Sequence, residues 1–448
     1  MKLGHIVAAT LLACVFAVGS LSAQNRPTDL SRQSAAGATA DLSRQSAAGA
    51  TADLSRQSAA GATVDWPQWR GPNRDGVIPS FTAPNPWPDK LTRKWKVEVG
   101  LGYATPVVIG NRVYMFARQG DEEVLDARDA DTGKVIWRTS YQAPFTISPA
   151  AARHEKGPKS TPTFADGKLF TLGMTGIVSA FDAGTGKRLW QTPPSQPGPL
   201  YHTSMSPLID RGLAIVHVGS HGRGALTAFD VNTGAVKWHW DGDGPGYGSP
   251  IVAEFEGTRQ IITMTQDNLV GVSASTGALL WQRRFQTNYT QNCITPVLYG
   301  QNVIVSGLDK GVTAFKLVKA NGQWNPVDVW ENPEVSLYMT NGVIVHDTFV
   351  ALSHKNSGQF FALDARTGKT VWKSAPRQAT NAAISRAGDL LFILKEDGEL
   401  LIARSGAGGL ETVKTYAVAD SATWSAPAVS GRRLFVKDVA SLTLWTMD

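Results

Sequence analysis

The chain has 448 residues, a formal net charge of +6 at pH 7 and 42% apolar residues. Its basic residues do not gather in one segment, which argues against a nucleic-acid-binding protein. After the first 23 residues, no run approaches the roughly 18 apolar residues of a membrane-spanning helix.

Residues 1–23 have the pattern of a secretory signal peptide. Lys2 supplies the positive start, residues 6–18 the apolar region, and Leu21-Ser22-Ala23 a small-residue cleavage site. The stretch that ends at Cys14 resembles a lipoprotein box, but the apolar run continues past it, which argues against acylation. We therefore expect an exported protein, in the periplasm or outside the cell. Cleavage would leave Cys293 as the single cysteine, so no internal disulfide could form.

Residues 24–64 read as a disordered low-complexity linker. They hold three near-perfect copies of a 12-residue repeat, which start at Asp29, Asp41 and Asp53. Each copy has one leucine and no aromatic residue, so it cannot bury enough apolar surface to offset the entropy lost on ordering. We assign this segment to a tether without chemistry.

The segment 65–76 opens the domain, which extends over residues 65–448. Trp66 and Trp69 flank a Pro-Gln pair, and Arg70-Gly71-Pro72 follows. This composition predicts a rigid extended segment that packs on the flank or an end face of the domain. A binding platform is the alternative.

A short phrase, small-apolar-Asp-x-x-Thr-Gly-x-x-x-Trp, then recurs through the domain. Its Asp and Trp positions are Asp129 with Trp137, Asp182 with Trp190, Asp230 with Trp238, Trp281 with Ser273 in the Asp place, and Asp364 with Trp372. Successive tryptophans lie 53, 48, 43 and 91 residues apart, and the last gap holds two units. One tryptophan and one turn in every 40 to 50 or so residues is typical of a β-propeller.

The unit from Ser160 to Trp190 shows how a blade is built. A Thr-Pro pair opens the first strand, because proline is tolerated where no ladder donor is needed. Asp166-Gly167 marks a hairpin, and two further apolar runs precede the Asp-x-x-Thr-Gly turn. The recurring aspartates occupy the same turn in each unit, so they favour turn capping over acid–base catalysis.

Counting such units predicts an all-β, eight-bladed propeller of four-stranded antiparallel blades. Two units are degenerate, with Lys316 and Arg404 in the Asp place. The C-terminal stretch 424–445 supplies three strands, and the segment around Trp95 supplies the missing outer strand. An N-terminal strand therefore closes the ring, which removes open sheet edges. Seven blades remain the alternative if a degenerate unit is a loop insertion.

Together with these repeats, the opening segment resembles exported bacterial proteins with pyrroloquinoline quinone (PQQ)-like propeller repeats. That superfamily includes the BamB-like outer-membrane assembly lipoproteins and, more distantly, the quinoprotein alcohol dehydrogenases. The resemblance implies a non-catalytic scaffold that binds protein or peptide partners in the cell envelope, with peripheral outer-membrane association and a monomeric state. The alternative is a small PQQ-dependent dehydrogenase or a PQQ-binding sensor.

The residues favour the scaffold over the enzyme. Quinoprotein dehydrogenases carry PQQ with calcium, adjacent cysteines and a set of acidic residues, whereas this sequence has no adjacent cysteines. It also lacks the Cys-x-x-Cys-His pattern of covalent haem attachment. No catalytic, cofactor-binding or metal-binding residue carries over from that pattern, and we expect no cofactor. PQQ with calcium is the alternative.

The topology places one set of residues at the mouth of the central channel. They precede the Ser/Thr-Pro openings of the blades, where the connection from one blade reaches the innermost strand of the next. The set consists of Tyr103, Lys159, His202, Tyr247, Asn292, Tyr338 and Trp424. A ring rich in aromatic and hydrogen-bonding groups suits a ligand or peptide site. Aromatic residues that simply plug the channel are the alternative.

Overall fold

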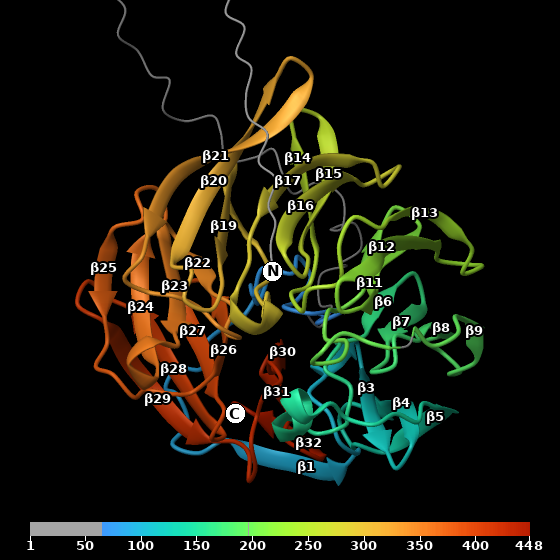
Figure 1. Ribbon diagram of the computed structural model, residues 1–448. Helices are drawn as coiled ribbons and strands as arrows, with labels where there is room; N and C mark the ends of the chain where they lie inside the picture. Colours follow the sequence, from blue (N-terminus) through green and yellow to red (C-terminus); the bar gives the residue numbers. More distant parts are fainter. Residues whose placement is uncertain (1–64, 196) are drawn as a thin grey trace, which may run out of the picture. The chain divides into compact units, whose positions relative to one another are not determined.

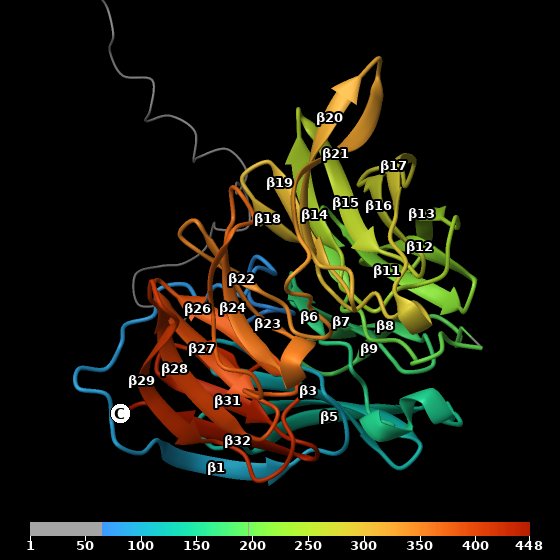
Figure 2. The same ribbon diagram turned by 60° about the vertical axis from the view of Figure 1, so that its left-hand side comes forward.

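The computed structural model describes residues 65–195 and 197–448, in which the chain forms eight sheets of four antiparallel strands around an axis (Figures 1 and 2). This confirms the predicted eight-bladed propeller, and both degenerate units form blades. The predicted signal peptide and linker lie outside the described residues. In the described part of the chain, no helix is long and apolar enough to span a membrane.

Blades 1 to 7 each take four consecutive strands, numbered from the axis outward. The strands of blades 1 to 4 are β2 (Val107–Ile109), β3 (Arg112–Gln119), β4 (Glu122–Asp129), β5 (Val135–Gln142), β6 (Thr163–Ala165), β7 (Lys168–Leu172), β8 (Val178–Asp182), β9 (Arg188–Gln191), β10 (Leu208–Asp210), β11 (Leu213–Ser220), β12 (Arg223–Asp230), β13 (Val236–Trp240), β14 (Ile251–Phe255), β15 (Thr258–Met264), β16 (Asn268–Ser273) and β17 (Leu279–Arg284). Those of blades 5 to 7 are β18 (Val297–Tyr299), β19 (Asn302–Ser306), β20 (Val312–Ala320), β21 (Gln323–Asn332), β22 (Val343–Val345), β23 (Thr348–Ser353), β24 (Gln359–Asp364), β25 (Thr370–Lys373), β26 (Ala382–Ala387), β27 (Leu390–Lys395), β28 (Glu399–Ser405) and β29 (Leu410–Ala417). Short 3₁₀ helices lie in three connections, η1 (Pro149–His154), η2 (Asn288–Thr290) and η3 (Lys355–Ser357).

Blade 8 joins strands from the two ends of the propeller. It contains β30 (Ala428–Ser430), β31 (Arg433–Lys437), β32 (Ser441–Thr446) and, outermost, β1 (Thr92–Glu98). The β1–β32 ladder is antiparallel and runs from Thr92 opposite Thr446 to Glu98 opposite Ser441. Figure 1 shows blue β1 beside red β32. The closing strand predicted around Trp95 is therefore confirmed.

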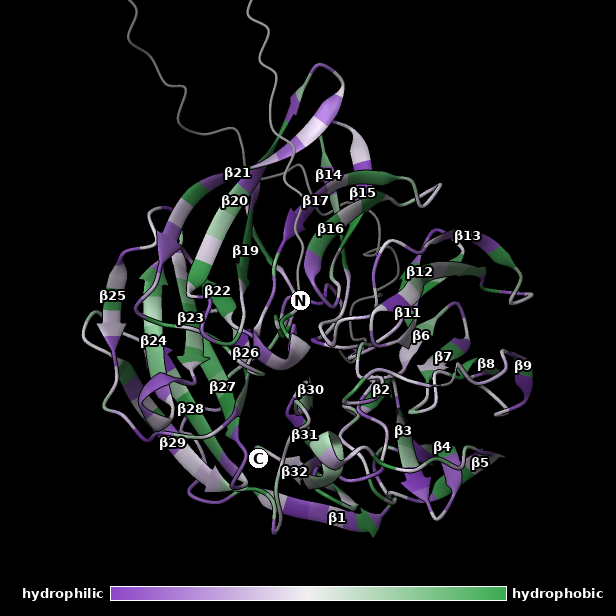
Figure 3. Cartoon of the chain, viewed as in Figure 1, coloured by the Kyte–Doolittle hydropathy of each residue, from purple (hydrophilic) through white to green (hydrophobic). Residues whose placement is uncertain are grey.

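Burial follows the position of a strand within its blade. The middle strands β23 and β24 are buried along most of their length, because both of their faces pack against neighbouring blades. The outermost strand β1 is largely exposed. Figure 3 shows the same gradient, with β1 mostly hydrophilic and β23 and β24 mostly hydrophobic. Each blade thus contributes its core to the interfaces on its two sides, and the ring is a continuous packed structure.

A tryptophan on the outer strand fastens five of the eight blades to the next one. The tryptophan on the outer strand of one blade donates its indole N–H to the turn of the following blade, at 3.0 to 3.2 Å. The pairs are Trp95 with Ala130, Trp137 with Ala183, Trp190 with Val231, Trp238 with Ala274 and Trp330 with Ala365. The turn glycine has a positive φ, and its missing side chain makes room for that indole ring.

Blade 4 departs from this pattern for a local reason. Blade 5 has Lys316 in the Asp place, and β20 continues into a long hairpin with β21 that extends outward (Figure 2). Trp281 therefore finds no turn in the next blade. Its Nε1 donates instead to Oε1 of Gln260 in its own blade, at 2.7 Å.

The segment 66–78 crosses the axis and contacts the innermost strands, whereas the sequence predicted packing on the flank or an end face. Its contacts reach six of the eight blades through Val108, Phe164, Ser206 with Pro207, Thr295, Gly342 and Arg386. Trp66 is fully buried. Inner-strand carbonyls around an axis need donors that the ladders do not supply, and this segment supplies them. We call residues 66–78 the axial plug.

Two buried arginines hold the axial plug in place. Arg70 Nη2 donates to the carbonyl oxygen of Gly342 at 2.6 Å. Arg74 donates from Nη1 to the carbonyl oxygen of Pro207 at 2.9 Å, and from Nη2 to that of Ser206 at 3.0 Å. Burial lowers the pKa of Arg70 to about 10 and that of Arg74 to about 9. Both guanidinium groups therefore stay charged at neutral pH, and the carbonyl dipoles solvate them.

Candidate functional site

A belt of hydrogen bonds surrounds the channel at the Ser/Thr-Pro openings. In each step, the backbone N–H of one blade donates to the side-chain oxygen of the next blade, at 2.8 to 3.2 Å. The belt runs in order through Thr105, Thr161, Ser206, Ser249, Thr295 and Asn341. These side chains therefore join blades. The residues that precede the belt lie at the mouth of the channel, on the side where the chain crosses from blade to blade.

On one side of the mouth, Lys159 lies among tyrosines. Its Nζ donates to the carbonyl oxygen of Tyr201 at 2.9 Å. The ring of Tyr201 meets that of Tyr247 edge-on, with centroids 5.5 Å apart, and the backbone N–H of Tyr201 donates to the Tyr247 hydroxyl at 3.2 Å. Tyr338 interacts electrostatically with Tyr201 and with Cys293. The structure thus brings Lys159, Tyr247 and Tyr338 of the predicted ring into one cluster.

Tyr103 and Trp424 form a second group at the mouth. Their ring centroids lie 6.3 Å apart, which brings blades 1 and 8 together. The imidazole of His154, at the end of η1, meets Trp424 edge-on at 5.1 Å. Burial, with a smaller contribution from Glu155, raises the pKa of Tyr103 to about 12, so its hydroxyl stays protonated. The connection between β5 and β6 therefore contacts the segment that leads into blade 8.

His202 and Asn292 are mostly occupied by contacts within the protein. The imidazole of His202 packs edge-on against Phe145 at 4.8 Å, and its Nε2 lies 3.2 Å from the backbone N–H of Ser148. Burial, helped by the Lys159 ammonium, lowers the pKa of His202 to about 4. The Asn292 side chain is fully buried, and its amide donates to three backbone carbonyls. It supports the loop and offers no surface at the mouth.

Cys293, the next residue, also belongs to the cluster around Lys159, although it is not in the ring predicted from the sequence. It is half-buried and lies near Lys159, Tyr247 and Tyr338: the Lys159 ammonium lowers the pKa of its thiol, and a Cys293 thiolate would raise the pKa of both tyrosines. Burial raises the pKa of its thiol to about 12, so the group stays protonated. Counting two residues back from the belt would have found it, because Tyr103, Lys159 and Tyr247 all precede their belt residues by two.

The residues at the mouth do not fit a quinone cofactor with calcium. Calcium binds six to eight or so oxygen ligands, several of them carboxylates. The groups of the predicted ring and Cys293 are aromatic rings, an amine, a thiol, an amide and a neutral imidazole. Glu155 adds an exposed carboxylate near Tyr103. Within residues 65–195 and 197–448, no three His, Cys, Asp or Glu side chains are grouped to hold a metal ion.

The repeated aspartates cap their own turns. Oδ1 of Asp129 accepts from the backbone N–H and the hydroxyl of Thr132, both at 2.8 Å, and Asp182 accepts in the same way from Thr185. These hydrogen bonds hold the pKa of both carboxyl groups below the usual value. The carboxylates are exposed at separate turns, so they form no acid–base pair.

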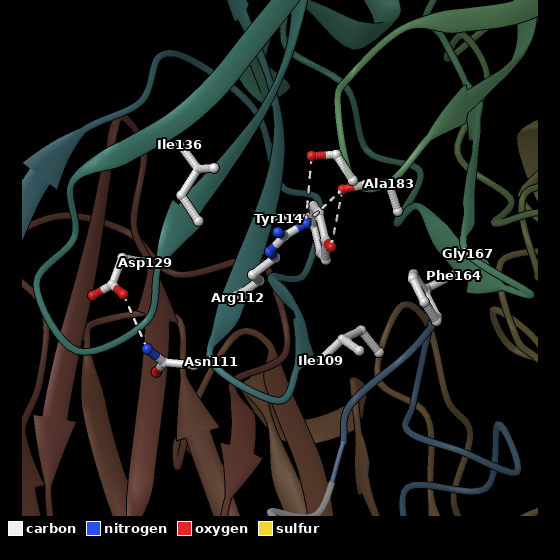
Figure 4. A pocket seen from close by; sticks show the side chains of 10 residues that line it. Ile109, Asn111, Arg112, Tyr114, Asp129, Ile136, Phe164, Gly167 and Ala183 are labelled. Atoms are coloured by element: carbon white, nitrogen blue, oxygen red, sulfur yellow. Dashed lines mark hydrogen bonds between the residues drawn. The ribbon is translucent and has the colours of Figure 1, made fainter.

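An open groove lies between blades 1 and 2 on the opposite face from the mouth (Figure 4). It has a volume of about 510 Å³ and an apolar wall that includes Ile136 and Phe164. Its polar groups already join the two blades, because Arg112 and Tyr114 both donate to the carbonyl oxygen of Ala183. With these groups engaged between the blades, the groove has little left to recognise a ligand, so the mouth is the stronger candidate.

Comparison with known proteins gives relatives of two kinds. The assembly factor BamB of Yersinia pestis is 24% identical over 366 residues, which cover 77% of this chain and 86% of the relative. The polyvinylalcohol dehydrogenase of Sphingopyxis sp. (strain 113P3) is 27% identical over 297 residues, which cover 63% of this chain and 35% of the enzyme.

Solved structures of both kinds share the fold. BamB from Moraxella catarrhalis superposes with a TM-score of 0.56 at 17% identity, over 80% of this chain and 97% of that one. The quinohemoprotein alcohol dehydrogenase of Comamonas testosteroni gives 0.57 at 14% identity, over 86% and 80%. The family model described as "Outer membrane protein assembly factor BamB" matches residues 89–239, 120–374 and 362–448. With PQQ-like repeats matched in every blade, the chain belongs to this BamB family of β-propellers.

Proposed function

We propose that the protein is an exported, non-catalytic scaffold that binds protein or extended peptide partners in the cell envelope. The observation that carries the proposal is the match to BamB proteins, which spans 77% of this chain and 86% of the relative from Yersinia pestis. That relative is named an outer membrane protein assembly factor. We further propose a monomer with peripheral attachment to the outer membrane.

Two surfaces suit partner binding. The mouth offers aromatic rings and hydrogen-bonding groups close together. The outermost strand of each blade offers an unpaired edge, to which an extended peptide could add as a fifth strand. The longest of these edge strands is β21, in which Val327 and Val329 are each 42% exposed.

Crosslinking in living cells tests the proposal. The full chain with a C-terminal affinity tag is crosslinked in its native host, and the captured proteins of the envelope and cytoplasmic fractions are identified by mass spectrometry. A variant that lacks residues 2–23 is the control, because it cannot be exported if those residues are the signal. We expect envelope proteins to be captured by the full chain alone. Recovery of the full chain in the cytoplasm, or equal capture by both forms, would contradict the proposal.

The second candidate is a PQQ-dependent dehydrogenase or PQQ sensor, because the relatives include quinone-dependent alcohol dehydrogenases. The chemistry of the mouth residues speaks against it. Titration of the purified protein with PQQ and calcium separates the candidates. The scaffold predicts no saturable binding, whereas micromolar or tighter binding would favour the second candidate.

A further inference from the structure

Lys159 places a cation at the mouth of the channel. It lies in the connection between β5 and β6, two residues before the belt residue Thr161, and it is partly exposed. Its ammonium group has three donors, of which one is used by the carbonyl oxygen of Tyr201. In the described part of the chain, no carboxylate forms an ion pair with Lys159. Glu155, four residues earlier, acts on Tyr103 on the other side of the mouth.

Tyr201, Tyr247, Tyr338 and Cys293 form a collar around Lys159, and their groups suit the binding of a carboxylate. The hydroxyl of Tyr247 accepts from the backbone N–H of Tyr201, which leaves its own proton to donate. Burial keeps this hydroxyl and the Cys293 thiol protonated, because it raises the pKa of both groups. The collar therefore offers hydrogen-bond donors and aromatic faces around one positive charge. A carboxylate held by an ammonium in such partly dry surroundings forms strong, charge-assisted hydrogen bonds.

Burial also makes the isolated charge costly to the fold. It lowers the pKa of Lys159 from 10.5 to about 8, yet the amine remains mostly protonated at neutral pH. A buried charge is destabilising unless it is paired. A ligand carboxylate would supply the pair that residues 65–195 and 197–448 do not provide.

The axial plug limits how a ligand can approach this cluster. Trp69 of the plug donates to the belt hydroxyl of Thr295 at 3.1 Å, so the plug closes the channel at the level of the belt. A polypeptide cannot thread through a channel that is closed there. It can present an end to the mouth.

We propose that this cluster, which we call the Lys159 collar, binds the C-terminal carboxylate of a partner polypeptide end-on. This assignment rests on the proposed scaffold function, and it specifies which part of the partner the Lys159 collar would bind. The ammonium of Lys159 binds the carboxylate, and the rings of Tyr201, Tyr247 and Tyr338 contact the last side chain.

Fluorescence anisotropy with labelled peptides tests the Lys159 collar. The probes are fluorescein-Gly-Ser-Gly-Ser-Ala-Phe as the free acid, the same peptide as the amide, and an amidated peptide with an internal aspartate. We expect the free acid to bind at least tenfold more tightly than either amide. Lys159→Met should remove this preference, whereas Lys187→Met, which changes an exposed lysine outside the mouth, should keep it. Equal binding of free acid and amide, or a preference that survives in Lys159→Met, would overturn the proposal.

A pH titration of the unchanged protein keeps the test independent of any folding defect in a variant. Affinity for the free acid should fall at least tenfold between pH 7 and pH 10 as the ammonium loses its proton, whereas binding of the amide should not change. His202, Cys293 and Tyr247 face Lys159 and do not titrate in this range, because burial lowers the pKa of the first and raises those of the others. A flat profile would overturn the proposal.

Two further results separate the collar from the scaffold function. Binding of the internal-aspartate peptide as tightly as the free acid would overturn the assignment to a chain terminus. If the unchanged protein binds the free acid and the amide equally, and Lys159→Met still captures the same envelope partners, the collar fails and the scaffold function stands. If the peptides behave as expected and no envelope partner is captured, the scaffold function fails.

Discussion

Trp190 on the outer strand of blade 2 covers Gly234 in the turn of blade 3. Its indole N–H donates to the carbonyl oxygen of Val231, and a Cβ on Gly234 would lie 2.7 Å from Cδ2 of the ring. Glycine is therefore favoured here for two reasons. Its φ is +71°, and its lack of a side chain leaves room for the neighbouring tryptophan ring. The same arrangement recurs around the ring.

Gly234→Ala should therefore destabilise the protein by about 2–4 kcal/mol, since it adds a steric clash to the cost of a left-handed backbone. Gly212→Ala is the matched control in the same blade. Gly212 has a φ of +81°, and a Cβ added there would meet no atom within 4 Å, so about 1–2 kcal/mol is expected. Urea unfolding measures both. Equal losses would show that the tryptophan contact contributes nothing.

The belt of hydrogen bonds predicts that removing one of its side-chain hydroxyl groups lowers the stability of the protein. Ser206 is buried, and its Oγ accepts from the backbone N–H of Thr161 at 3.0 Å. Ser206→Ala should cost about 1–3 kcal/mol, because it leaves a buried N–H without an acceptor. Ser275→Ala, at an exposed turn, should change stability by less than about 0.5 kcal/mol. A Ser206→Ala protein as stable as this control would contradict the belt.

The axial plug should contribute strongly to stability. Trp66 is fully buried at the axis, and its backbone exchanges both hydrogen bonds with Val108. Trp66→Ala should lower the free energy of unfolding by about 3–5 kcal/mol. Tyr289→Ala removes a large ring that is 74% exposed and should have little effect. Thermal unfolding followed by circular dichroism compares the two, and similar midpoints would show that the plug is only loosely attached.

Stability should fall on acidification because of buried histidine. His217 is fully buried, and burial lowers its pKa from 6.5 to about 4. Between pH 6.5 and pH 4 the unfolded chain binds more protons than the folded chain. The contribution of neutral His217 to the free energy of unfolding is therefore fully present above pH 6.5 and is lost toward pH 4, by roughly 3 kcal/mol. His217→Gln should make this decline smaller, and the remainder is expected from His202, whose pKa burial also lowers to about 4. His239→Gln, at an exposed position of the same blade, should leave the decline unchanged. An unchanged slope in His217→Gln would rule out this origin.

The repeat made the architecture predictable from the sequence. The contacts that explain why particular residues recur lie between repeats, so the sequence of one repeat does not reveal them. Trp137 and Asp182 marked blade ends in the sequence because turn and strand chemistry are local. That Trp137 packs on Gly186 is a relation between two blades, which no single repeat contains. The closing strand around Trp95 was predictable because an unpaired three-stranded blade requires a fourth strand.

The mouth was predictable only to within a residue or two. The Ser/Thr-Pro openings gave the level of the ring, so Tyr103, Lys159 and Tyr247 were selected from their position alone. The choice of Asn292 over Cys293 depended on the path of a loop, which the motif does not specify. The axial plug was harder still, because its arginines bind backbone carbonyls, and backbone carbonyls leave no signature in a sequence.

The closure of blade 8 has a consequence for synthesis. During translation, β1 emerges long before the strands β30 to β32 with which it shares a sheet. In an emerging nascent chain β1 therefore has no partner strand until β32 has been made, and blade 8 cannot form before then.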